Sequence, residues 1–378
     1  MCVLVLLVRS FDVHHKTNTG GVLLHTVLDR VRQALADTGL GGIIVARPEN
    51  RFYLSGFTGS AGVLLITKSD AVLLTDFRYV EQARQQSPAF RAVQVTNLHD
   101  GLAEMFAGSG AELGFESDYV TVSWLDEFKQ RGVAHRLVPA KGLVEKMRAV
   151  KTAGELNKIA RACEIVDVGF GHILDSLRPG LREIDIALEL EFFMRRHGAQ
   201  ALAFDMIVAS GKRSAMPHGR ASAKRIETGD FVTFDIGVVV DGYCSDMTRT
   251  VVVGKASTKQ ERVYDTVLKA QTAALECIRA GARCSEVDGV ARRLIAEAGH
   301  AEHFGHGLGH GVGVAVHEQP RLSPVAGDAV LEAGNVVSVE PGIYVDGWGG
   351  VRIEDLVAVT EDGLRNFTTS PKQLIQLY

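Results

Sequence analysis

The sequence predicts an α+β protein with two domains, a smaller α/β domain and then a larger domain built from two related halves. The length of 378 residues exceeds what one hydrophobic core usually supports, because single cores stop growing at about 250–300 residues. Short apolar strands alternate with helical patterns in the first part of the chain. In the second part, the segment 229–243 recurs as 334–348, which predicts the two halves.

The first domain is expected over residues 22–140. A helix is predicted from His25 to Gly39, where Val27, Leu28, Val31 and Leu35 have helical spacing. Strands are predicted at 42–46, 62–66, 71–75, 92–95 and 112–115. Residues 1–21 are expected to form an N-terminal extension, because the apolar run Cys2–Val8 is too short to span a membrane. A degenerate export signal remains the alternative.

The second domain is expected over residues 145–378, after a linker at Pro139–Gly142. A long helix is predicted to start near Thr152, with an apolar face that includes Ile159, Cys163 and Val166. Further helices are predicted at about 183–197, 258–280 and 286–298, and glycine-punctuated strand hairpins lie between them.

The composition excludes some classes of function. With 46% hydrophobic residues, 23% charged residues and a net charge of −4, the chain is typical of a soluble globular protein. It has no excess of basic residues, so nucleic acid is not an expected partner. The five cysteines form no CxxC pair, which argues against a disulfide framework and a thiolate zinc site and favours a reducing cytoplasm.

The repeat places an acid at the same position of an apolar strand in each half. Asp235 lies among Phe231, Val232, Phe234 and Ile236, and Glu340 is its counterpart in the second copy. An ionised carboxylate in such a strand is unfavourable by several kcal/mol unless it is paired or bound to a metal. The two acids are therefore candidate metal ligands.

After the Val-Asp-Gly turn of each copy, the returning strand supplies a second acid, Asp246 in the first half and Glu354 in the second. Four neighbouring carboxylates cannot all remain ionised without cations, and two divalent ions would neutralise them. A set of oxygen ligands with one imidazole suits Mn²⁺, Co²⁺ or Zn²⁺.

The imidazole is expected from His310, in a segment where glycines alternate from Gly305 to Gly313. Because so many glycines make a poor helix, His306 and His310 are not expected to form a helical zinc pair. An extended segment would instead let the backbone approach a ligand closely. His317 and His218 are expected as outer histidines of the site. His306 is either a further active-site histidine or a strand residue, and His300 and His303 are expected to be ordinary surface or helix-end residues.

Several short motifs in the second domain occur together in a recognisable order. They are Pro217–Gly219, Asp235–Gly237, Ser245–Thr250, Gly309–Gly311, His317–Pro320, Glu340–Tyr344 and Val351–Asp355. With them the chain closely resembles the creatinase-fold, or pita-bread, metallopeptidases, and among these the Xaa-Pro peptidases, prolidase and aminopeptidase P. The resemblance implies a pita-bread catalytic domain with a pseudo-twofold repeat, preceded by a smaller α/β domain. It also implies two metal ions held by Asp235, Asp246, His310, Glu340 and Glu354, with Asp246 and Glu354 bridging them.

The resemblance further implies hydrolysis of the Xaa-Pro bond at the N-terminus of dipeptides or short peptides, and a homodimer formed through the N-terminal domain. Glu340 is expected to accept the proton of the attacking water, and His218 and His317 to serve hydrogen bonding and proton transfer. Arg352 is expected to pair with a ligand carboxylate. Arg321 and Tyr344 are candidates for the lining of the substrate pocket.

The first domain carries a weaker resemblance to aminopeptidase P in Asn50–Ser60 and Thr75–Tyr79. The family usually has glycine where this chain has Phe77, which leaves the choice between prolidase and aminopeptidase P open. A methionine-type aminopeptidase shares the fold and ligands but is disfavoured by the extra N-terminal domain. Creatinase, which needs no metal, and non-catalytic pita-bread binding proteins are disfavoured because all five ligand positions are kept.

Overall fold

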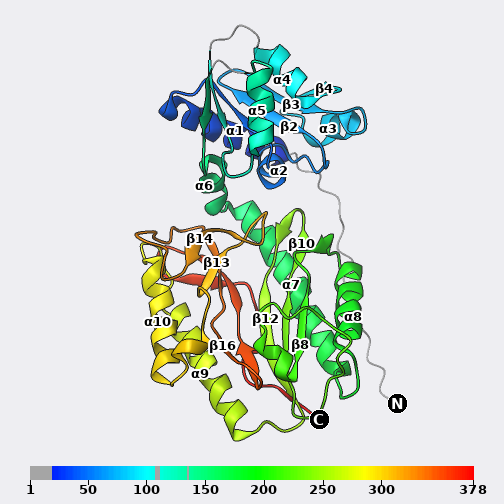
Figure 1. Ribbon diagram of the computed structural model, residues 1–378, viewed down its shortest axis with the longest axis vertical. Coiled ribbons are helices and arrows are strands. Elements are labelled where there is room, and N and C mark those ends of the chain that lie inside the picture. Colours follow the sequence, from blue (N-terminus) through cyan, green and yellow to red (C-terminus); the bar gives the residue numbers. More distant parts are fainter. Residues whose placement is uncertain (1–18, 107–110, 134–135) are drawn as a thin grey trace, which may run out of the picture. The chain divides into compact units, whose positions relative to one another are not determined.

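The computed structural model describes residues 19–106, 111–133 and 136–378 (Figure 1). The chain divides into two compact units, Met1–Lys141 and Gly142–Tyr378. The extension expected at 1–21 lies outside the described residues except for its last three, which belong to helix α1 (Thr19–Thr38). None of the described helices combines the length and the apolar character needed to cross a membrane.

The first unit is built on a six-stranded mixed sheet with the strand order β4-β3-β2-β1-β5-β6. Its core lies between the sheet and its helices and contains Ile44, Leu65, Leu74, Leu102 and Leu113. The strands are β1 (Gly42–Val45), β2 (Val63–Thr67), β3 (Ala71–Thr75), β4 (Arg91–Gln94), β5 (Glu112–Phe115) and β6 (Arg136–Pro139). After α1, the helices are α2 (Pro48–Ser55), α3 (Val80–Gln86), α4 (Leu98–Phe106) and α5 (Val122–Gln130).

The linker was expected at Pro139–Gly142, but in the structure Pro139 is the last residue of strand β6. The linker is therefore only residues 140–142, and helix α6 (Leu143–Ala149) follows Gly142 directly. Gly142 has a φ of 72°, a left-handed conformation that glycine adopts without strain. The connection is therefore a single tight turn.

The second unit contains the remaining long helices. They are α7 (Ala153–Ser176), α8 (Glu183–Arg196), α9 (Thr258–Leu275) and α10 (Cys284–Glu297). Helices α7 and α9 each begin with a capping box, formed by Thr152 with Glu155 and by Ser257 with Gln260. Helix α9 ends before the expected residue 280, because the chain tightens into turns in which Ile278 N–H donates to Leu275 O.

The strands of this unit form two main sheets, with the orders β20-β12-β9-β8 and β14-β13-β15-β18-β19. The first contains β8 (Ile207–Ser210), β9 (Phe231–Ile236), β12 (Met247–Val253) and β20 (Gln376–Leu377). The second contains β13 (Gly309–Gly311), β14 (Glu318–Leu322), β15 (Val336–Val339), β18 (Asp355–Val359) and β19 (Leu364–Asn366). Smaller pairings involve β7 (Ala201–Leu202), β10 (Val238–Val240), β11 (Tyr243–Cys244), β16 (Gly342–Val345) and β17 (Gly349–Arg352).

Each main sheet has its own helix pair and its own core. Phe170 of α7 and Leu190 of α8 pack with Phe234 of β9 in one buried cluster. Val263 of α9 and Val287 of α10 belong to a second cluster, together with strands β15 and β18. Figure 1 shows the two helix pairs on opposite sides of the unit, with the strands between them. The second unit therefore consists of two halves, as the sequence repeat predicted.

The acids of the repeat lie at the ends of the central strands of these sheets. Asp235 is in β9, where it pairs with Thr248 of β12, and Asp246 immediately precedes β12. In the other half, Glu340 follows β15 and Glu354 precedes β18, next to the pair Val339–Asp355. The antiparallel central pair of each sheet thus brings one acid from each of its strands to the same end.

Candidate metal centre and active site

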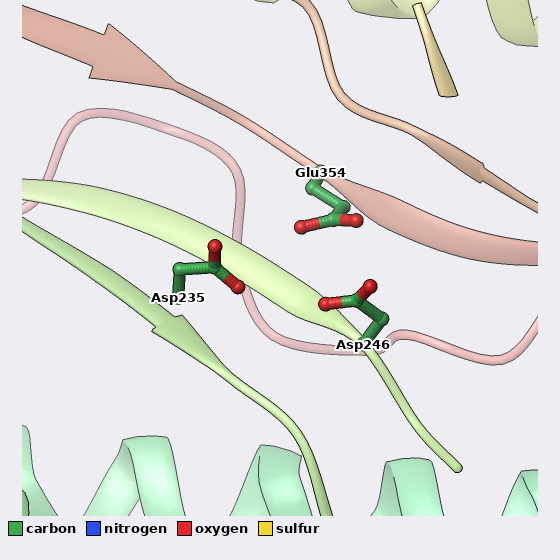
Figure 2. Close-up of side chains that lie close together, drawn as sticks. All are labelled: Asp235, Asp246 and Glu354. Atoms are coloured by element: carbon green, nitrogen blue, oxygen red, sulfur yellow. The ribbon is translucent and has the colours of Figure 1, made fainter. Parts of the chain in front are cut away.

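Three carboxylates from the two halves converge in the interior of the second unit. One oxygen each of Asp235, Asp246 and Glu354 can be chosen so that all lie within 4.8 Å of one another. Figure 2 shows the three side chains pointing toward a common centre from their separate strands. This spacing allows one cation to contact carboxylates of both halves.

Two carboxylate oxygens of these acids are buried without a hydrogen-bond partner among the described residues, Oδ1 of Asp235 and Oε1 of Glu354. The other oxygen of each group is satisfied, because Arg352 Nη2 donates to Asp235 Oδ2 at 2.6 Å and Thr248 Oγ1 donates to Glu354 Oε2 at 2.7 Å. Buried polar atoms in native proteins nearly always have partners. The two oxygens that lack one belong to acids that converge on the same centre, so the residues fit a metal ion.

The electrostatics of the three acids lead to the same conclusion. Burial raises the pKa of Asp246 well above its usual value, and the charges of Glu354, Asp235 and Glu340 raise it further. Burial, with Glu340 and Asp235, does the same for the pKa of Glu354. Burial also raises the pKa of Asp235, although Arg352 opposes this change. The cluster needs protons or cations to neutralise it.

Glu340 and His310 join the cluster from the second half. His310 Nε2 lies 3.2 Å from Glu340 Oε1 and 3.7 Å from Asp246 Oδ2, while His310 Nδ1 faces the carbonyl of Gly311 at 3.1 Å. Although burial acts in the opposite direction, the bond with His310 lowers the pKa of Glu340 to about 2. The same bond raises the pKa of His310 against the effect of burial. The five predicted ligand residues therefore lie together.

The glycines beside His310 allow the close approach of its strand. A Cβ atom on Gly309 would lie 2.0 Å from the carbonyl oxygen of Ser338 in β15, and one on Gly311 would lie 2.3 Å from that of Gln319. Side chains at these positions would separate β13 from its neighbours. Glycine is thus required for His310 to reach the acids.

Arg352 connects several parts of the site through one buried guanidinium. Besides the bond to Asp235, Nη1 donates to the hydroxyl of Tyr344 at 2.9 Å and to the carbonyl of Pro217 at 3.2 Å, and Nε donates to Thr248 Oγ1 at 3.0 Å. Pro217 directly precedes His218, so Arg352 holds both Asp235 and the segment that carries His218. Burial, with Arg352 opposing it, raises the pKa of Tyr344 to about 12.

The outer histidines are more exposed than the five predicted ligand residues. His317 is exposed, and its ring centroid is 4.4 Å from that of His310. Desolvation of the ring lowers the pKa of His317, and the charges of His310, Arg321 and His218 lower it further. His218 is also exposed. Arg321 is exposed on β14 and pairs in register with His310.

The remaining histidines divide into two groups. His306 is half-buried, and its Nε2 lies 3.0 Å from the Tyr344 hydroxyl, so it contacts the Arg352 network. His300 and His303 contact each other, with their Nδ1 atoms 3.1 Å apart.

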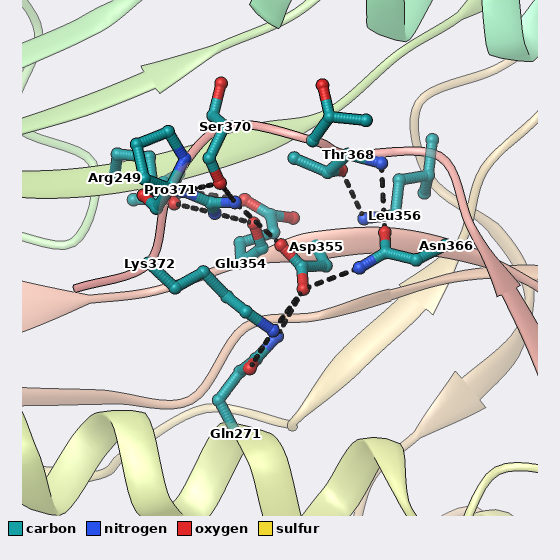
Figure 3. Close-up of polar contacts among 12 residues, drawn as sticks. Arg249, Gln271, Glu354, Asp355, Leu356, Asn366, Thr368, Ser370, Pro371 and Lys372 are labelled. Atoms are coloured by element: carbon teal, nitrogen blue, oxygen red, sulfur yellow. Dashed lines mark hydrogen bonds and ion pairs between the residues drawn. The ribbon is translucent and has the colours of Figure 1, made fainter.

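Sequence reasoning missed an ionic cluster directly behind Glu354 (Figure 3). Arg249 donates to the backbone carbonyl of Glu354, and its Nη2 donates to Asp355 Oδ1 at 2.8 Å. Asp355 also accepts from Lys372 Nζ at 2.7 Å and from Gln271 Nε2 at 3.1 Å. Arg249 could have been found by the argument applied to Asp235, since a charge inside the apolar strand Met247–Val253 requires a partner.

Comparison with known proteins relates both units to described families. Residues 157–361 match metallopeptidase family M24, and residues 28–150 match the creatinase/prolidase N-terminal domain. An uncharacterized peptidase of Bacillus subtilis, YqhT, is 44% identical over 352 residues, which cover 93% of this chain and 99% of the relative.

Two solved structures are similar over nearly their whole length. An Xaa-Pro dipeptidase from Bacillus anthracis is 47% identical, with a TM-score of 0.90, over 94% of this chain and 100% of that one. An X-Pro aminopeptidase from Thermotoga maritima is 37% identical, with a TM-score of 0.87, over 92% of this chain and 99% of that one.

Proposed function

Because the chain belongs to metallopeptidase family M24, we propose that it hydrolyses the Xaa-Pro bond at the N-terminus of dipeptides or short peptides. The predicted family and fold class, an α/β domain before a pita-bread domain, are confirmed by the two family matches and the similar structures. The observation that carries the metal-dependent chemistry is the convergence of Asp235, Asp246 and Glu354. The choice of proline is supported by relatives that are named for it.

The proposal includes two divalent ions, with Mn²⁺ as the first candidate and Co²⁺ or Zn²⁺ as alternatives. Asp235, Asp246, His310, Glu340 and Glu354 would hold them, with Asp246 and Glu354 shared between the ions. The buried oxygens of Asp235 and Glu354 that lack a partner among the described residues support this assignment. Bound ions would lower the pKa of water towards about 7 and polarise the scissile carbonyl.

The side chains around the site would then provide proton transfer and orientation. Glu340 would accept the proton of the attacking water. An Xaa-Pro bond is a tertiary amide, so its nitrogen must gain a proton as it leaves, and His317 and His218 are the proposed groups. Arg352 would orient Asp235.

The test is to remove metal with a chelator, restore Mn²⁺, Co²⁺ or Zn²⁺ separately, and assay Ala-Pro and Ala-Pro-Ala. We expect hydrolysis to be lost and then restored by at least one ion. A preference for Ala-Pro would identify a prolidase, and a preference for Ala-Pro-Ala an aminopeptidase P. Absence of activity on both peptides with every ion would refute the proposal.

A methionine-type aminopeptidase is the second hypothesis for the enzyme, and cleavage of Met-Ala-Ser in preference to Ala-Pro-Ala would establish it.

We also propose a homodimer, from the family resemblance alone, which light scattering after gel filtration would test. The proposed domain limits, 22–140 and 145–378, are supported by the division into compact units at Lys141–Gly142.

A further inference from the structure

We propose that Glu318 is a positioning residue, which with Arg148 and Lys151 fixes the loop that carries His317. The three side chains form a buried cluster, called the Glu318 clamp below. Glu318 follows His317 directly in the sequence, within the motif His317–Pro320, but the proposed mechanism gives it no role. The inference rests on the proposed function, in which His317 acts in proton transfer.

The loop between β13 and β14 needs such an anchor. His310 pairs with Arg321 and Gly311 pairs with Glu318, and the register shifts between these two pairs. Residues 312–317 between them form no helix or strand. His317 therefore lies at the end of an irregular segment, where side-chain contacts decide its position.

Glu318 folds back over this loop. Its Oε1 accepts a hydrogen bond from Ala315 N–H at 2.9 Å. A Cβ atom on Gly313 would lie 2.7 Å from Glu318 Oε2, so the carboxylate rests directly against the loop backbone. From the other side, Cys244 N–H donates to Gly313 O at 2.7 Å, which joins the loop to the hairpin that leads to Asp246.

Two cations hold the carboxylate in this position. Arg148 Nη2 donates to Glu318 Oε1, and Lys151 Nζ lies 3.3 Å from Oε2. The side chains are buried, with exposures of 4% for Arg148, 1% for Lys151 and 6% for Glu318. Ion pairs at this depth contribute less to net stability than to a unique geometry, because desolvation opposes the Coulomb attraction.

The cations are themselves fixed by the backbone around them. Lys151 N–H donates to Gly334 O at 2.8 Å, and Asn335 Nδ2 donates to Ala149 O at 3.0 Å. Gly334 and Asn335 immediately precede β15, whose end carries Glu340. The Glu318 clamp therefore fixes His317 relative to β15, the strand that also positions Glu340, a proposed metal ligand.

The kinetic test is a double-mutant cycle with Glu318→Gln and His317→Ala, in the metal-loaded full-length protein. We expect Glu318→Gln to lower kcat by about 10–100-fold, as is typical when a supporting residue is lost, with little change in KM. In the His317→Ala background, the same change should alter kcat less than about twofold. Equal effects in both backgrounds would overturn the proposal.

Glu116→Gln is the matched control. Glu116 is a buried carboxylate of the other compact unit and accepts from the backbone N–H of Ala46 and from Asn50 Nδ2. We expect this control to lower thermal stability. Its effect on kcat should be the same with and without His317→Ala. If the control also lowered kcat less in the His317→Ala background than in the parent, the coupling would be a general effect of losing a buried carboxylate. That result would overturn the assignment to Glu318.

Hydrogen exchange measured by mass spectrometry gives a readout that needs no activity. Exchange over residues 312–317 should accelerate in Glu318→Gln and in the milder Arg148→Lys, which keeps the charge but loses the planar donor group. Unchanged exchange in both variants would overturn the clamp even if the protein hydrolysed neither peptide. Absence of activity in the parent protein would refute only the proposed function.

Discussion

Asp246 is an acid of the site with three carboxylate neighbours that raise its pKa. Burial raises its pKa, and Glu354, Asp235 and Glu340 raise it further. In a metal-free protein this carboxylate repels its neighbours, whereas in the proposed site it is a shared ligand. One substitution should therefore affect stability and activity in opposite directions.

We predict that Asp246→Asn abolishes hydrolysis and metal binding but raises the Tm of the chelated protein at pH 8. Relief of about 1 kcal/mol would correspond to about 2–4 °C for a unit of this size. Activity assays, metal analysis and thermal melts check the three parts. Full activity with two bound ions would contradict the shared-ligand role.

Arg352 gives a second prediction at the residue scale. Arg352→Lys keeps the charge but cannot contact Asp235, Tyr344 and Thr248 together, since an ammonium group lacks the planar fork of donors. We expect kcat or metal affinity to fall by about 10–100-fold. Arg365→Lys, at an exposed arginine that stacks on Phe367, is the control and should behave like the parent. Equal kinetics in both variants would show that the fork is not needed.

Among the elements, strand β13 depends most on the absence of side chains. We predict that Gly309→Ala destabilises the protein by about 1–3 kcal/mol and weakens metal binding, because the new Cβ would meet Ser338 O at 2.0 Å and push His310 away. Gly305→Ala is the matched control from the same glycine run, since its Cβ would meet no atom within 4 Å. Chemical denaturation and metal titration compare the two variants. Similar results for both would contradict the packing argument.

Elements with a strong local signal could be predicted from the sequence. The apolar face that begins near Thr152 located α7, and the repeat located the strand ends that carry Asp235 and Glu340. Both signals lie within short stretches of chain, where spacing alone determines which face a side chain occupies.

Contacts between distant segments could not be predicted in this way. Arg148 and Glu318 are 170 positions apart, and no periodicity relates them. The contact between Arg249 and the carbonyl of Glu354 likewise depends on how the two sheets meet. The four acids could be located because the repeat duplicates their positions, whereas the residues that support them occur once.

At the scale of the whole second unit, the candidate metal centre connects two halves that have separate cores. Asp235 and Asp246 come from the half covered by α7 and α8, and His310, Glu340 and Glu354 come from the half covered by α9 and α10. Ions bound by all five would therefore link the halves directly. Metal binding should stabilise the whole unit rather than one loop.

We predict that the gain in Tm on adding Mn²⁺ to the chelated protein increases with pH. The folded-state pKa values of Asp246 and Glu354 are raised, so the stability from their protonation is present below about pH 4 and lost as pH rises through the raised values. The pKa of His310 is also raised, and it must lose its proton to bind a metal. Protons and metal thus compete for the same groups.

Melts with and without Mn²⁺ at about pH 5, 6, 7 and 8 would measure this gain, and calorimetry in two buffers would count the protons released on binding. Glu318 and Asp355 have lowered pKa values, but they titrate in the metal-free and in the metal-bound protein alike. Their effect therefore cancels in the difference between the two Tm values. Asp246→Asn, which is predicted not to bind metal, should show no gain in Tm with Mn²⁺ at any of these pH values. A gain that is constant with pH, without proton release, would mean that the raised pKa values do not belong to the metal-binding groups.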